Sequence, residues 1–139
     1  IQNTDVDVVI GSRFLKDNSY KTTVSKKLGM VLFGLLTSFI TRIKITDPTS
    51  GFQILKGDVI DFMSQDLYPA DYPDADMIIL LHRAGFKIKE VPVKMKSNPR
   101  HAKSMHRGHK TIYYVLKMLL SIIVTVLRVK PKRKNTNAA

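Results

Sequence analysis

The chemically richest stretch of this chain is residues 46–52, Thr-Asp-Pro-Thr-Ser-Gly-Phe, which we call the site loop. Pro48 disfavours helical geometry at Asp47, and the side chains of Asp47 and Ser50 can hydrogen-bond nearby backbone. Gly51 allows backbone angles that other residues resist. Such loops often carry ligands in doubly wound sheets, so Asp47, Ser50 and Gly51 are candidate site residues. The alternative is a helix stop followed by a tight turn.

Arg13 and the start of the next helix are candidates for binding anions. Residues 5–10 form a short β-branched run followed by Gly-Ser-Arg, which predicts a buried strand leading into a polar loop. Arg13 could hold a phosphate or carboxylate through a bidentate fork, or form a surface salt bridge. Lys21 and Ser25, with two further lysines, crowd the first turns of the helix, where cations oppose its dipole. A bound anion would relieve that conflict, and a solvated lysine cluster is the alternative.

Two aspartates, Asp74 and Asp76, precede a predicted helix at residues 77–84. A carboxylate at the amino end of a helix is electrostatically favourable, which accounts for both without any function. The functional alternative is that one of them acts as a general base at the mouth of the sheet.

Residues 94–110 form a basic loop with six lysines and arginines, three histidines and no acidic residue. Histidines invite a metal site, but no carboxylate or cysteine accompanies them here. The composition therefore favours a loop that holds anions, with Arg100, Lys103 and Ser104 as its candidate residues.

The remaining pattern predicts an α/β fold. A helix capped by Thr22 or Thr23 runs to about residue 43, a strand covers residues 52–55, and Asp58 caps a short helix through residue 63. Gly85 ends the helix at residues 77–84, and residues 87–93 alternate as a strand that Pro92 restricts to an edge or an end. The long helix carries an apolar face at Val24, Leu28, Val31, Leu32, Leu35, Leu36, Phe39, Ile40 and Ile43.

The last predicted helix, residues 111–129, has a narrow polar stripe at Lys117, Ser121, Thr125 and Arg128 and is apolar elsewhere. It is short and interrupted for a membrane span, which needs about 20 apolar residues. An amphipathic helix lying at a membrane interface fits better, with tyrosines at one end and cations at the other. Packing on the body of the protein or on a second copy is the alternative.

Composition narrows the class of protein. At 139 residues the chain is one domain, and the absence of cysteine excludes disulfides and thiolate metal sites and suits a cytosolic location. No signal peptide is visible, and we expect the chain to be a piece of a longer protein. Residues 1–90 hold 11 basic and 11 acidic residues, whereas residues 91–139 hold 12 basic and none acidic, which gives the net charge of +12. The cationic end implies an anionic partner, either a membrane surface or nucleic acid. Nucleic-acid binding is disfavoured because no aromatic residue stands among the cations of residues 94–110.

Taken in order, five motifs resemble the carboxy-terminal half of family-2 glycosyltransferases, in the branch of dolichyl-phosphate mannose synthase and bacterial polyprenyl-phosphate glycosyltransferases. They are residues 8–13 (Val-Val-Ile-Gly-Ser-Arg), 47–52 (Asp-Pro-Thr-Ser-Gly-Phe), 72–76 (Tyr-Pro-Asp-Ala-Asp), 85–93 (Gly-Phe-Lys-Ile-Lys-Glu-Val-Pro-Val) and 103–106 (Lys-Ser-Met-His). The resemblance covers residues 5–129. It implies a partial GT-A (Rossmann-like) sheet with flanking helices. Residues 1–110 would be the acceptor-side half, 111–129 a membrane-interface or dimerisation helix and 130–139 a basic flexible tail.

The resemblance also implies roles for individual residues. Arg13 matches an arginine near the phosphates, and Lys21 and Ser25 match a basic residue and a serine that hold the acceptor phosphate, with lysine here where arginine is usual. Asp47, Ser50 and Gly51 match the loop of the site, with Asp47 expected to take part in catalysis. Asp74 matches the general base of members whose acceptor is a hydroxyl, although Pro73 replaces the usual glutamate. Arg100, Lys103 and Ser104 match a phosphate-contacting loop, with shifted spacing and no glycine.

The implied reaction is inverting transfer of a sugar from a sugar nucleotide to a lipid-linked acceptor, either a polyprenyl phosphate or a lipid-diphosphate saccharide. The family holds a divalent cation, Mg or Mn, through an Asp-x-Asp motif in the upstream half. Asp5-Val-Asp7 and Asp74-Ala-Asp76 are in the wrong places for that motif. We therefore expect the fragment alone to be inactive, and the full enzyme to lie in the cytoplasm, peripherally bound to the inner face of the membrane. A homo-oligomer and a monomer both stay open. The alternative is a non-enzymatic basic module that binds an anionic membrane surface or nucleic acid.

Overall fold

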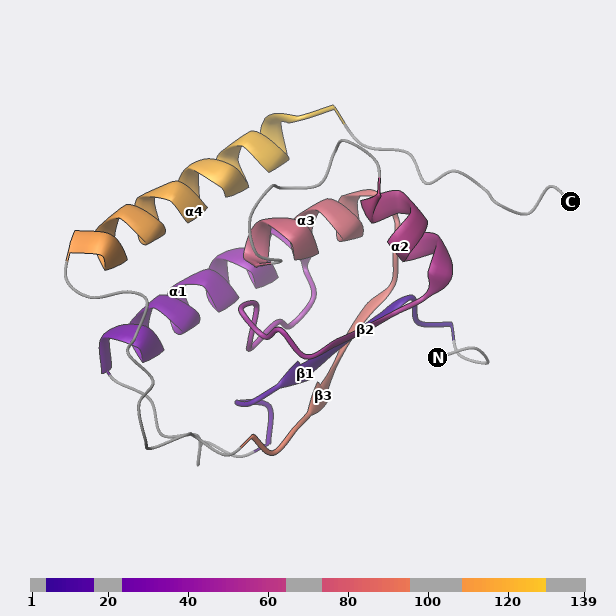
Figure 1. Ribbon diagram of the computed structural model, residues 1–139, viewed down its shortest axis with the longest axis horizontal. Helices are drawn as coiled ribbons and strands as arrows, with labels where there is room; N and C mark the ends of the chain where they lie inside the picture. Colours follow the sequence, from indigo (N-terminus) through magenta and orange to yellow (C-terminus); the bar gives the residue numbers. More distant parts are fainter. Residues whose placement is uncertain (1–4, 17–23, 65–73, 96–108, 130–139) are drawn as a thin grey trace, which may run out of the picture.

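The computed structural model describes residues 5–16, 24–64, 74–95 and 109–129 (Figure 1). Within these ranges the chain forms a mixed α/β structure, which confirms the predicted class. The elements in chain order are β1 (Val8–Ser12), α1 (Val24–Thr41), β2 (Gln53–Leu55), α2 (Gly57–Met63), α3 (Ala75–Arg83), β3 (Ile88–Pro92) and α4 (His109–Leu127).

The three strands form one mixed sheet in the order β2-β1-β3. The central strand β1 is antiparallel to β2 and parallel to β3, and Val8 lies opposite Leu55 and Ile88. Pro92 is at the end of β3, an edge strand of this sheet, as its missing N–H predicted. Because β1 and β3 are parallel, their carboxyl ends meet at one edge of the sheet.

The structure is layered, with the sheet on one side, α1 and α3 next to it, and α4 over those helices on the side away from the sheet (Figure 1). The first hydrophobic cluster lies between the sheet, α2 and α3 and includes Val8, Ile10, Phe62 and Phe86. A second cluster joins α1, α3 and α4 through Phe33, Ala75, Ile79, Met118 and Ile122. Residues 75–81 of α3 are all buried, because this helix is covered by the sheet on one side and by α4 on the other.

The described helix ends agree with the local signals only in part, since α1 ends at Thr41 and not at about residue 43, and α4 begins at His109 and not at residue 111. Gly85 follows α3 with a φ of 94°, the left-handed conformation that favours glycine after a helix. The predicted cap of α2 was wrong, since its N-cap residue is Lys56 and Asp58 lies in the first turn. The Lys56 carbonyl accepts the amides of Val59 and Ile60, and Asp58 still benefits from the helix dipole there.

The long apolar face of α1 is only partly covered. Of its predicted residues, Leu28, Val31, Leu32, Leu35 and Phe39 are exposed. The buried side of α1 is formed instead by Phe33, Thr37 and Thr41, which the prediction did not include. Helix α4 is similar, since its outer side exposes Ile112, Tyr113, Leu116, Leu120, Ile123, Val124 and Leu127. Two members of the polar stripe of α4 lie toward the body instead, because Thr125 is buried and the Ser121 hydroxyl donates to Asp76.

The packing around Phe33 gives a stability test. Its ring lies edge-on to Tyr114 at a centroid distance of 6.4 Å, so Phe33→Ala should open a cavity in the second cluster and lower the free energy of unfolding by about 3 kcal/mol. Phe39→Ala is the matched control on the same helix, because Phe39 is 84% exposed. Urea denaturation followed by circular dichroism measures both, and equal effects of the two variants would contradict the assigned packing.

Candidate functional site

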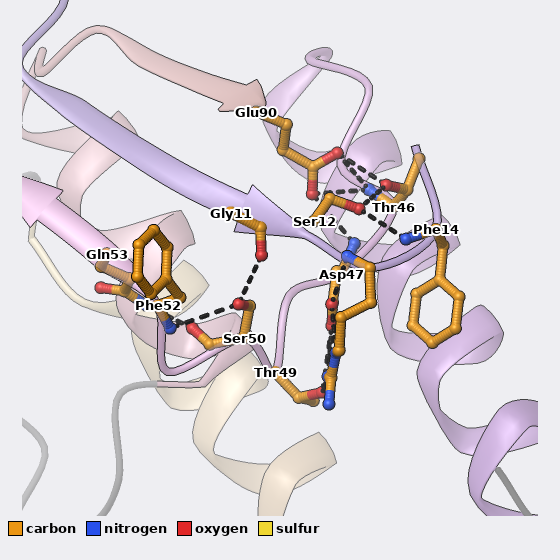
Figure 2. A network of polar contacts seen from close by, with 11 residues as sticks. Gly11, Ser12, Phe14, Thr46, Asp47, Thr49, Ser50, Phe52, Gln53 and Glu90 are labelled. Atoms are coloured by element: carbon orange, nitrogen blue, oxygen red, sulfur yellow. Dashed lines mark hydrogen bonds and ion pairs between the residues drawn. The ribbon is translucent and has the colours of Figure 1, made fainter. Parts of the chain in front are cut away.

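The site loop crosses the edge of the sheet where β1 and β3 end, and a carboxylate of β3 holds it there (Figure 2). The backbone amide of Thr46 donates to both carboxylate oxygens of Glu90 at 2.9 Å, and the amide of Asp47 donates to Oε1 at 2.9 Å. The Thr46 hydroxyl donates to Oε2 at 2.7 Å. Glu90 therefore satisfies donors at the start of the loop and ties it to the sheet.

A chain of hydroxyl contacts extends this anchor back to β1 (Figure 2). The oxygens of Ser12 and Thr46 are 2.6 Å apart, and the Phe14 amide donates to the Ser12 oxygen at 3.1 Å. Because the Thr46 proton is directed at Glu90, Ser12 must donate to Thr46. The dipoles thus align from the Phe14 amide to the Glu90 carboxylate, an arrangement in which each hydrogen bond polarises the next.

Arg13 and Asp47 form a bidentate ion pair in the middle of the site loop. Arg13 Nε donates to Asp47 Oδ2 at 2.6 Å, and Nη2 donates to Oδ1 at 2.7 Å. The Arg13 amide adds a third bond to Oδ2 at 3.1 Å, and the Thr49 hydroxyl lies 3.4 Å from Oδ1. The Asp47 side chain is 0% exposed and that of Arg13 is 13% exposed, so the carboxylate is enclosed by its cation. This geometry lets Asp47 orient the guanidinium plane.

The other predicted loop residues differ in what they do. The Ser50 hydroxyl donates to the Gly11 carbonyl at 2.6 Å and accepts the Phe52 amide, so it secures the loop to β1. Gly51 is exposed and does not have a positive φ, which makes the expected backbone requirement wrong. The turn is closed by the Ser50 amide on the Asp47 carbonyl, and Gly51 follows it. Space for a side chain is smallest at Gly11, where a Cβ would lie 2.6 Å from the Phe52 ring and 2.8 Å from a Val93 methyl group, so a larger residue needs these side chains to move.

Asp74 and Asp76 belong to a second polar network, between α3 and α4. The Tyr114 hydroxyl donates to Asp74 Oδ2 at 2.6 Å, and the Ser121 hydroxyl donates to Asp76 Oδ2. Asp76 Oδ1 also accepts the Met77 amide at 2.8 Å. Asp74 occupies the N-cap position of α3, but its side chain makes no capping hydrogen bond. Burial, followed by the hydrogen bond to Asp74, raises the pKa of Tyr114 well above its ordinary value, so its hydroxyl stays protonated.

The structure thus brings Arg13, Asp47 and Ser50 together and places Asp74 in the second network. The other predicted positions, Lys21, Arg100, Lys103, Ser104 and the Ser25 side chain, lie outside the described residues.

Sequence reasoning missed Glu90. The alternation of β3 carries a signal for it, because Glu90 shares a face with the buried Ile88. A carboxylate on an inward-facing position needs partners to offset its desolvation.

An apolar pocket of about 500 Å³ lies beside the site loop, along α1. Its lining includes Phe14 and Thr46, the chain neighbours of Arg13 and Asp47. The pocket therefore adjoins the ion pair. Three cations, Lys27, Arg42 and Lys44, also line the pocket. The rest of the lining is mainly apolar and consists of Phe14, Met30, Val31, Gly34, Leu35, Ser38, Ile43, Ile45 and Thr46.

Neither a protein-family model, nor a curated protein, nor a solved structure matches this chain. A metal site needs about three histidine, aspartate or glutamate side chains close together, and the described residues contain no such group. No described helix is long and apolar enough to cross a membrane. The family therefore stays a prediction from the sequence motifs.

The anchor of the site loop can be tested at Glu90. Glu90→Gln replaces one accepting oxygen by an amide that would face donors, so we expect unfolding free energy to fall by about 2 kcal/mol and the Thr46 and Asp47 amides to exchange faster. Lys89→Gln, on the neighbouring exposed position, is the control. Denaturation and amide hydrogen exchange measure both effects. Unchanged exchange at Thr46 and Asp47 in Glu90→Gln would show that Glu90 does not anchor the loop.

Proposed function

We propose that this chain is the acceptor-side part of an inverting family-2 glycosyltransferase with a GT-A fold. It would transfer a sugar from a sugar nucleotide to a lipid-linked acceptor, a polyprenyl phosphate or a lipid-diphosphate saccharide. The observation that supports this most is the Arg13–Asp47 ion pair, held by Glu90 where two parallel strands end. Ligands of open α/β sheets bind at such edges, and an oriented guanidinium is suited to phosphate oxygens.

In this proposal Arg13 stabilises the negative charge that develops on the departing nucleoside diphosphate. Asp47 serves as the residue that positions Arg13, because both of its oxygens accept bonds from that side chain. Asp47 then acts by positioning Arg13 and not in direct catalysis, which is the role that the resemblance implied for it. The expected divalent cation, Mg or Mn, has no ligand set among the described residues, so none of these steps is assigned to it.

The pocket beside the site loop supports an acceptor with an apolar chain and an anionic group. Its aliphatic lining suits a prenyl chain, and Lys27, Arg42 and Lys44 suit a phosphate. The exposed apolar sides of α1 and α4 support peripheral contact with the inner face of the membrane, because apolar helix faces flanked by cations bind at the lipid interface. The carboxy-terminal positive charge adds attraction to anionic lipids.

The second candidate is a non-enzymatic module that binds an anionic membrane surface. The apolar outer side of α4 and the 12 basic residues after residue 90 favour it. This function would make no use of the buried Arg13–Asp47 pair beyond stability, so variants at that pair separate the two candidates.

The decisive experiment measures radiolabelled sugar transfer from a panel of sugar nucleotides to a lipid extract. The 139-residue chain is compared with the same chain joined to its natural upstream sequence, and we expect transfer only from the longer protein. Asp47→Ala should lower its kcat at least about 100-fold, because Arg13 loses its orienting partner, and Arg13→Lys about 10-fold. Asp61→Ala, at an exposed residue of α2, is the control.

One outcome would replace this proposal with the membrane module. It is the absence of transfer to lipid or to any added saccharide, combined with equal binding of the longer and shorter chains to anionic vesicles.

The pocket provides a further test, with farnesyl phosphate as the probe. Val31→Trp should narrow the pocket and raise the Kd for binding of farnesyl phosphate about fivefold, because Val31 lines it. Leu32→Trp is a close control, since the two residues are 48% and 47% exposed on the same helix and only Val31 is among the lining residues. Equal effects of the two variants on this Kd would indicate that the surface of α1, and not the pocket, contacts the prenyl chain.

A further inference from the structure

We propose that Tyr114 of α4 is a positioning residue for Asp74, and that the nucleophile which Asp74 activates is a hydroxyl of the acceptor. This inference rests on the proposed function and on the general-base role that the family resemblance implies for Asp74. It goes further in two ways. It links the general base to α4, and it chooses a lipid-diphosphate saccharide as the acceptor, because that acceptor has a hydroxyl nucleophile. A polyprenyl phosphate is already anionic and needs no base.

The first step is the unusual use of Asp74 at the start of α3. Aspartate at an N-cap normally accepts an amide of the first turn, but the side chain of Asp74 makes no such bond. Asp76, two residues later, accepts the Met77 amide of its own helix. The Asp76 carboxylate is therefore used by the helix backbone, whereas that of Asp74 is directed to Tyr114, on an element 40 residues away.

The second step is the rigidity of the donor. Tyr114 packs against the second hydrophobic cluster, and its ring meets Phe33 at an interplanar angle of 88°. Its pKa is raised by burial and by the Asp74 carboxylate, so the hydroxyl remains a donor throughout the physiological pH range. A fixed donor 2.6 Å from Oδ2 restricts rotation of a carboxylate that is itself 9% exposed. A general base needs such restriction, because proton transfer depends on geometry first.

The third step is the consequence for α4. Tyr114 belongs to the helix whose outer side is apolar, so the orientation of Asp74 depends on how α4 is seated. In the reaction, the acceptor oxygen bonds to the anomeric carbon while the bond to the diphosphate oxygen breaks. The nucleoside diphosphate leaves with the electron pair, and Asp74 takes the hydroxyl proton and later passes it to water.

The test uses the longer protein with two probe acceptors, farnesyl diphosphate-linked N-acetylglucosamine, which offers hydroxyls, and farnesyl phosphate. Tyr114→Phe retains the ring against Phe33 and removes only the donor. We expect its kcat with the hydroxyl acceptor to fall about tenfold or more. The KM for this acceptor and the KM for the sugar nucleotide should stay within about twofold of those of the unaltered protein. Ser121→Ala is the matched control, since it removes the other hydroxyl that α4 donates to a carboxylate of α3. Its kcat should stay within about twofold.

Three results would overturn the inference. Equal loss of kcat in Tyr114→Phe and Ser121→Ala would mean that the seating of α4 matters and the hydrogen bond to Asp74 does not. Transfer by the unaltered protein to farnesyl phosphate alone would remove the need for a base, while leaving the proposed glycosyltransferase intact. Transfer to neither probe, nor to any lipid in an extract, would overturn both the inference and the proposed function. Circular dichroism and thermal unfolding of each variant separate loss of folding from loss of rate.

Discussion

Burial of the Asp47 carboxylate is the constraint on which the candidate site depends. Removing a carboxylate from water costs several kcal/mol unless a cation and further donors replace the lost solvation. Arg13 supplies both arms of its fork and its own amide, which brings the loop after β1 against the site loop. The bidentate geometry holds only if the site loop keeps its position. Glu90 keeps the site loop in position by accepting the amides of Thr46 and Asp47 at the start of that loop. Two carboxylates, those of Asp47 and Glu90, therefore couple the loop after β1, the site loop and β3.

Helix α3 has a comparable role for the second network. It is buried along residues 75–81 between the sheet and α4, so the carboxylates at its start are necessarily drawn into the interior. Hydroxyls offset that cost without adding positive charge, since Tyr114 and Ser121 each donate to one aspartate. The two sites thus differ in chemistry. One encloses a carboxylate with a cation, and the other holds an aspartate next to neutral donors.

The exposed apolar surface is the main feature that folding leaves unsatisfied. Helices α1 and α4 share the second cluster, yet each also presents a row of aliphatic and aromatic side chains to solvent. Large contiguous apolar surface on a small protein marks an interaction site. Part of this surface, Val31 and Leu35 of α1, also lines the pocket beside the site loop.

Local patterns in the sequence predicted the α/β class and most element boundaries to within a few residues. Periodicity, the glycine at Gly85 and the proline at Pro92 are local signals that act through backbone geometry. The sequence also located the loops that carry Arg13, Asp47 and Asp74. What these groups do depends on tertiary contacts, because their partners come from positions 34 to 43 residues away. Tertiary contacts also turn part of the polar stripe of α4 inward and leave little space for a side chain at Gly11, in contrast to Gly51. The physical reason is that a pattern records which side chains share a face, whereas burial depends on which neighbouring element covers that face.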